Sequence, residues 1–139
     1  MANTNFSSSR LFSYQYDPVM ISGSFEIDTG AIVAATIHGD GLMPGVPPAS
    51  ITYNGVGDYT VNLRDRFRHI ISAVCQLEFA AGTPNVDLVA RVGQSVLGAA
   101  AANTIDLHCT TTAGPALADP ADDNRINFLF ILSNSILDM

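Results

Sequence analysis

The sequence predicts an all-β protein: a single-domain β-sandwich or small barrel of about eight strands, preceded by an extended N-terminal arm. Short segments in which apolar and polar residues alternate recur along the chain, as in half-buried strands. Turns rich in glycine, proline and asparagine separate these segments. The chain has 139 residues, which suits one domain with a sizeable core.

The predicted arm comprises residues 1–19, and the predicted domain comprises residues 20–139. The arm is polar overall, yet it carries five large apolar side chains: Phe6, Leu11, Phe12, Tyr14 and Tyr16. A solvated tail seldom carries so many, and aromatic groups are common anchors of protein interfaces. We expect these five residues to bind a partner; the alternative is that they fold back on their own domain.

Residues 20–28 are predicted to form the first strand of the domain, because apolar side chains from Ile21 to Ile27 alternate with serines and a glutamate. The β-branched run at residues 31–39 predicts a second strand. Residues 41–50 contain three prolines and two glycines, which cannot sustain a ladder and therefore predict a loop.

Residues 50–63 are predicted to form a β-hairpin. Asn54-Gly55 is a strong signal for its turn, and Gly57-Asp58 follows directly behind. In the second limb, Tyr59, Val61 and Leu63 are expected to share one face of the strand.

Three of the six arginines lie in the segment RDRFRH, residues 64–69. The spacing of the apolar residues from Phe67 onward predicts a corner of roughly one helical turn there, followed by a strand from Ile71 to Phe79. Arg64, Arg66 and Arg68 would then lie at the end of a sheet. We expect them to pair with Asp65, Asp58 or a partner's carboxylates, and to set the register of binding.

Three more strands are predicted in the second half, at residues 86–92, 104–110 and 125–135. The last is apolar on both faces, with Phe128 to Ile131 in an unbroken run. Such a strand is central in a sheet or is covered on its outer face.

The charge of the chain restricts the partners that it can bind. The net charge is −7 and there is no lysine, which argues against nucleic acids and anionic membranes, because both attract clustered cations. Only 14% of residues are charged, which suggests that partners cover some of the surface. No signal peptide and no apolar run of about 18 residues are present, so we expect a cytoplasmic protein or part of a larger assembly.

No motif of a known catalytic or nucleotide site is present, so we expect a protein that is not an enzyme and holds no cofactor or metal. Two alternatives would bind a metal ion through residues that are not part of a known motif. A cupin-like metal enzyme would use His38, His69 and His108. A calcium loop would use the oxygens of residues 119–124, although aspartate and asparagine are also ordinary turn residues.

Cys75 and Cys109 lie in apolar runs, without the spacing of a zinc site. We expect two buried free thiols, which behave as small hydrophobic groups. A disulfide or a reactive thiol is the alternative.

The pattern of residues 55–135 resembles small virion proteins of tailed bacteriophages. The resemblance rests on the run GVGDYTVNLRDRF, the strand TIDL, the loop ADPADD and the final strand that ends in SNS. It implies a capsid decoration, or cement, protein: an all-β body that often forms trimers and binds the major capsid protein on the outside of the head. No catalytic residue is implied. We therefore expect a homo-oligomer, with a trimer favoured over a dimer, that is assembled in the host cytoplasm.

A module of a phage fibre or spike that recognises a host glycan is the alternative function. The loops at residues 39–50 and 113–124 would then form one rim, with Tyr53 and Tyr59 as groups on which a sugar could stack.

Overall fold

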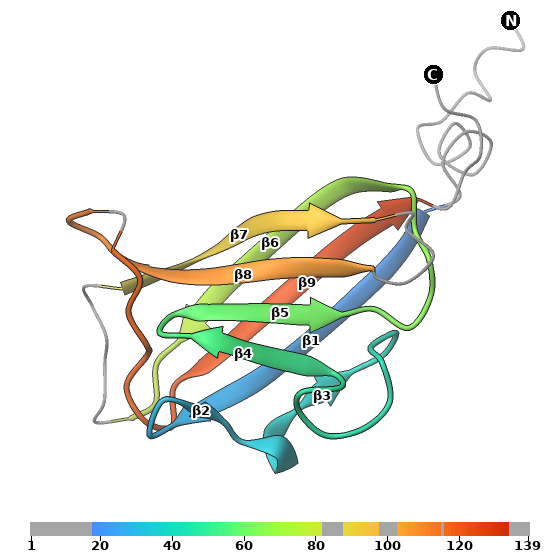
Figure 1. The fold of residues 1–139 in the computed structure, drawn as a ribbon. Coiled ribbons are helices and arrows are strands. Elements are labelled where there is room, and N and C mark those ends of the chain that lie inside the picture. Colours follow the sequence, from blue (N-terminus) through green and yellow to red (C-terminus); the bar gives the residue numbers. More distant parts are fainter. Residues whose placement is uncertain (1–17, 82–87, 98–102, 115, 134–139) are drawn as a thin grey trace, which may run out of the picture.

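A computed structural model of the chain describes residues 18–81, 88–97, 103–114 and 116–133. These residues form nine strands in two antiparallel sheets. Figure 1 shows the two sheets packed face to face, with their strands crossing obliquely. The predicted all-β sandwich is confirmed.

The five-stranded sheet contains the first and last strands and has the order β2–β1–β9–β6, with β3 paired to β1 as well. Its strands are β1 (Pro18–Asp28), β2 (Ala31–Ile32), β3 (His38–Gly39), β6 (His69–Glu78) and β9 (Arg125–Ser133). The doubly apolar strand β9 lies between β1 and β6, as expected for a strand with no polar face in its middle.

The four-stranded sheet has the order β4–β5–β8–β7. Its strands are β4 (Ile51–Gly55), β5 (Asp58–Asn62), β7 (Leu88–Val96) and β8 (Thr104–Thr111). The β4–β5 hairpin and the predicted alternation in its second limb are confirmed, because Tyr59, Val61 and Leu63 are buried while Thr60 and Asn62 are not.

The core lies between the inner faces of the two sheets. Ile21, Phe25 and Ile27 of β1 are buried there, which confirms the alternation predicted for that strand. The rings of Phe25 and Tyr59 join the two sheets, with their centroids 5.4 Å apart. Gly23 also faces inward, and a Cβ atom at this position would lie 2.4 Å from the ring of Phe128. A glycine is therefore needed for Phe128 to pack against β1.

The segment 31–39 is not one strand, contrary to the prediction. A short 3-10 helix (Ala34–Thr36) separates β2 from β3. The hydroxyl of Thr36 donates a hydrogen bond to the Val33 carbonyl at 2.7 Å and accepts one from the Glu26 amide at 2.9 Å. This threonine therefore stabilises a turn within a run whose β-branched composition favours a strand.

The turn of the hairpin lies at Val56–Gly57, two residues beyond Asn54-Gly55. Gly57 has a φ of 67°, which favours glycine. Its amide donates to Asp119 at 2.7 Å, and its carbonyl accepts from the Cys109 amide at 2.8 Å. Contacts with distant segments therefore select the position of the turn.

The corner at residues 64–69 contains no helical turn, so this prediction is wrong. Three of its amides donate to other segments: Arg64 to the Gly41 carbonyl, Phe67 to the Asn103 side chain and Arg68 to the Ser133 carbonyl. These partners prevent the local hydrogen bonds that a helical turn would require.

Two further details differ from the expected pattern. The β6–β9 register shifts between Ile70 and Ser72, so Ile71 does not share the inward face of Ala73 and Cys75 and is 37% exposed. Strand β1 begins at Pro18, so the last two residues of the predicted arm belong to the sheet.

Candidate docking surface

The outer face of the five-stranded sheet changes from apolar at one end to charged at the other. The register of β1, β9 and β6 defines four rows of outward side chains across it: Met20–Ile131–Ser72, Ser22–Leu129–Val74, Ser24–Asn127–Gln76 and Glu26–Arg125–Glu78. In the first two rows, Met20 is 68% exposed and Val74 is 55% exposed. We call these two rows, with the adjacent Ile71, the apolar end of the outer face.

At the charged end of this face, the side chains bond mainly to one another. Arg125 forms an ion pair with Glu26, and the Asn127 amide donates to Glu78 at 2.9 Å. Most of these groups therefore have partners within the molecule; the buried Nε atom of Arg125 has none among the described residues. The unmet requirement for burial therefore lies at the apolar end.

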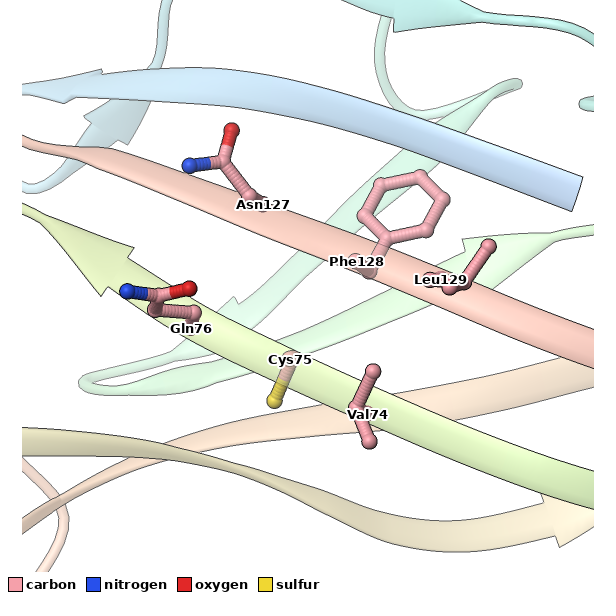
Figure 2. Close-up of a pocket in the computed structure, with 6 residues that line it drawn as sticks. All are labelled: Val74, Cys75, Gln76, Asn127, Phe128 and Leu129. Atoms are coloured by element: carbon pink, nitrogen blue, oxygen red, sulfur yellow. The ribbon is translucent and has the colours of Figure 1, made fainter.

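A shallow hollow of about 460 Å³ lies between β6 and β9 on this sheet. Figure 2 shows its six lining residues, three from each strand: Val74, Cys75 and Gln76 from β6, and Asn127, Phe128 and Leu129 from β9. Val74 is opposite Leu129, and Gln76 is opposite Asn127. The hollow thus has an aliphatic pair on one side and an amide pair on the other.

The corner that carries the three predicted arginines joins the sheet at the same end as the apolar rows. The Arg68 amide donates to the Ser133 carbonyl, and Ser133 pairs with Pro18, the first residue of β1. All three side chains are exposed. Arg64 lies 3.6 Å from Asp65, a pair in which both side chains are more than 60% exposed, so it contributes little to stability. Asp58 is paired instead with His108 at 3.4 Å, in the other sheet.

The outer face of the four-stranded sheet is polar and bonded to itself. The Asn54 amide donates to the Thr60 hydroxyl at 2.7 Å, and that hydroxyl donates to Asp106 at 2.7 Å. The Asn62 amide donates to Thr52 at 3.0 Å. Such a face is stable in contact with water and needs no cover.

Asp119 connects the β8–β9 loop to the hairpin, a role that the sequence did not predict for it. Its carboxylate accepts hydrogen bonds from the Gly57 amide at 2.7 Å, from Tyr53 at 2.8 Å and from Tyr59 at 3.0 Å. Burial, followed by the negative charge of Asp119, raises the pKa of Tyr59 above its ordinary range. Asp119 therefore acts as a structural clamp: its carboxylate holds the Gly57 amide and the two tyrosine hydroxyls together. The buried Tyr59 hydroxyl stays protonated and donates to it.

The other acidic residues of this loop also serve the fold. Asp122 accepts from the Thr29 amide at 2.7 Å, and the buried Asn124 accepts from the Ala80 amide at 2.8 Å. The turn interpretation of residues 119–124 therefore holds. Among the described residues, no group of three His, Cys, Asp or Glu could hold a metal ion.

The three histidines belong to different parts of the fold. His38 pairs with Ser24 in β1, His69 lies opposite Ser133, and His108 is on the outer face of the other sheet. Both cysteines are free, as predicted; Cys109 is buried, whereas Cys75 is only half-buried. Burial raises the pKa of Cys75 and of Cys109 to about 12, which makes both thiols poor nucleophiles at neutral pH.

Two expectations of the glycan-binding alternative are wrong. Tyr59 is completely buried, so no sugar can stack on it. The loop at residues 39–50 bonds to Asn62 and Arg64, whereas the loop at residues 113–124 bonds to Gly57 and Thr29. The two loops therefore lie at opposite ends of the sandwich and form no common rim (Figure 1).

The five arm residues predicted to bind a partner, Phe6, Leu11, Phe12, Tyr14 and Tyr16, lie outside the described residues. In the part of the chain that the structure describes, no helix is long and apolar enough to cross a membrane. No family model, curated protein or solved structure matches this chain.

Proposed function

We propose that this protein is a capsid decoration, or cement, protein of a tailed phage. It binds the outer surface of the head and stabilises contacts between major capsid protein subunits. One observation carries the proposal: the apolar end of the outer face, the arginine corner and Pro18, where residues 1–17 join the domain, meet at one end of the sandwich. The resemblance of residues 55–135 to small virion proteins supports it.

Each group in this region has a distinct task in the proposed contact. The apolar side chains of the arm, Phe12, Tyr14 and Tyr16 above all, supply buried area and most of the affinity. Arg64, Arg66 and Arg68 pair with carboxylates of the shell at the rim of the contact and fix its register.

The proposed protein acts as an oligomer, with a trimer favoured. Once one subunit of an oligomer is bound, the others bind at high effective concentration, so modest contacts add up to a stable attachment. A protein that bridges neighbouring shell subunits in this way resists their separation. This role requires no catalytic group.

The proposal is tested by mixing the purified protein with expanded, undecorated heads and imaging the particles by cryo-electron microscopy. The expected result is saturable density at symmetry-related positions on the outer surface. A triple variant, Phe12→Ser, Tyr14→Ser and Tyr16→Ser, should lose most of this binding. Phe79→Ser is the matched control, because Phe79 is 43% exposed just beyond the charged end of β6.

Two results would count against the proposal in different ways. If the unmodified protein leaves the heads undecorated at saturating concentration, the proposed function is wrong. If the triple variant binds as well as the unmodified protein, the arm is not the anchor.

A further inference from the structure

We propose that, in the free protein, residues 1–17 lie across the outer face of the five-stranded sheet of their own molecule, with the ring of Phe12 in the hollow between β6 and β9. The inference concerns the isolated protein, so it holds or fails independently of the proposed function.

The surface that needs a cover is the apolar end of the outer face. Met20, Ile71 and Val74 are exposed there beside the half-buried Leu129 and Ile131. The register places these residues in adjacent positions, so they form a continuous strip. A continuous apolar strip on a protein surface indicates a site for another apolar group.

The nearest segment of chain is the one that precedes Pro18. Pro18 is opposite Ser133, and the first apolar row begins two residues further along β1 at Met20. Residues 1–17 therefore join the domain at the edge of the surface to be covered. A tethered segment binds its own domain at a high effective concentration, which favours it over a free molecule.

The length of the tether selects Phe12. The hollow lies about 17 Å from Pro18 along the strands and about 7 Å across them, at the usual spacings of a sheet. An extended chain spans about 3.3 Å per residue, so Tyr16 reaches about 7 Å from Pro18 and Tyr14 about 13 Å. These two rings can cover Met20 and Ile131. These spans are upper limits, because the chain before Pro18 must turn back over the sheet. Phe12 spans at most about 20 Å and is the first aromatic residue whose backbone can reach the hollow.

The lining of the hollow suits a flat ring without a hydroxyl group. Val74 and Leu129 offer aliphatic contact, and Gln76 can direct amide N–H groups at a ring face, whereas the Asn127 amide donates to Glu78. Residues 134–139, which follow Ser133, contain no aromatic residue.

The test uses the full chain with Phe12→Trp. The protein has no tryptophan, so the new side chain is the single indole reporter. We expect blue-shifted emission and quenching by acrylamide several-fold weaker than for free indole in water. Because burial of one aromatic ring favours the docked state by about tenfold or more, the signal should report mainly that state.

Val74→Glu, introduced into the Phe12→Trp protein, should move the emission to longer wavelength and restore strong quenching. Val56→Glu is the matched control, since Val56 is 56% exposed, close to the 55% of Val74, but lies in the β4–β5 turn. It should leave the emission unchanged. Circular dichroism verifies that all variants are folded.

Three outcomes would overturn the inference. Solvent-exposed emission in the Phe12→Trp protein would show that the ring is not docked. Emission that is blue-shifted only at high protein concentration, with a matching increase in mass, would identify a second copy as the occupant. Blue-shifted emission unaffected by Val74→Glu would place the ring elsewhere on the protein.

Discussion

The two sheets have similar inner faces and opposite outer faces. The outer face of the four-stranded sheet is a ladder of threonine, asparagine and aspartate side chains that bond to one another. The outer face of the five-stranded sheet carries Met20, Val74, Leu129 and Ile131 in adjacent rows. The outer face of the four-stranded sheet is suited to contact with water, whereas the outer face of the five-stranded sheet exposes apolar side chains.

This difference separates stability from binding in the molecule. The groups that hold the sandwich together lie inside it and at the clamp formed by Asp119. The groups available to a partner lie at the apolar end of the outer face and in the arginine corner. Substitutions in the first set should therefore change stability, and substitutions in the second set should change binding.

The largest effect on stability is expected at the clamp. Asp119→Ala removes the acceptor of the buried Tyr59 hydroxyl and of the Gly57 amide. Because buried donors without a partner are costly, the free energy of unfolding should fall by about 3 kcal/mol, as measured by urea denaturation. Tyr53→Phe is the control; it removes one partly exposed hydrogen bond and should cost about 1 kcal/mol or less. Equal losses in the two variants would mean that Asp119 is not the centre of the clamp.

An intermediate effect is expected at alkaline pH, and it tests whether the inner faces are alike. Each sheet has one inward cysteine, and burial raises the pKa of both Cys75 and Cys109 from 9.0 to about 12. A raised pKa in the folded state gives stability that is complete below pH 9 and is lost as the pH rises towards 12, because the unfolded chain releases its protons first. Stability should therefore decline across this window.

Cys75→Ala and Cys109→Ala should each reduce the slope of stability against pH between 9 and 12, by similar amounts. The slope is compared with that of the unmodified protein, because each substitution also changes the packing of the core. A reduced slope in Cys109→Ala alone would show that water reaches the inner face of β6, and the inner faces would then differ as well.

The smallest effect on stability is expected at the arginine corner. Arg64→Ala removes an exposed ion pair with Asp65, so the free energy of unfolding should change by less than about 0.5 kcal/mol. Arg125→Ala, at the charged end of the outer face, should cost more, because its ion pair with Glu26 is partly buried. Urea denaturation at one salt concentration compares the two variants. A larger loss for Arg64→Ala would mean that the corner supports the fold.

Much of the fold could be predicted from the sequence, because alternation along a strand is a local property. The inward positions of β1, β5 and β8 follow directly from the periodicity of their side chains. The central place of β9 followed from its two apolar faces. The predictions for the hairpin turn and the arginine corner failed because these segments bond to residues far along the chain. The prediction for residues 31–39 failed because the Thr36 side chain stabilises a turn with Val33 and Glu26.

The candidate site was less accessible to prediction. The exposed arginines could be recognised by their spacing, but the apolar end of the outer face combines residues 20, 71, 74, 129 and 131 from three strands. No local pattern links them. The sequence indicated Asp119 only as a turn residue or a calcium ligand, because its three donors lie about sixty residues earlier in the chain.

The sequence by itself determined that the chain forms strands with one apolar face, since alternation depends only on neighbouring residues. It also determined that the last strand must be surrounded, and that both cysteines lie among apolar groups. Only the tertiary structure decided which outer face is bonded to itself and which is left apolar, because that depends on which strands become neighbours and in what register. A shift of one residue in a ladder would exchange inner and outer side chains, so the docking surface is a property of the pairing.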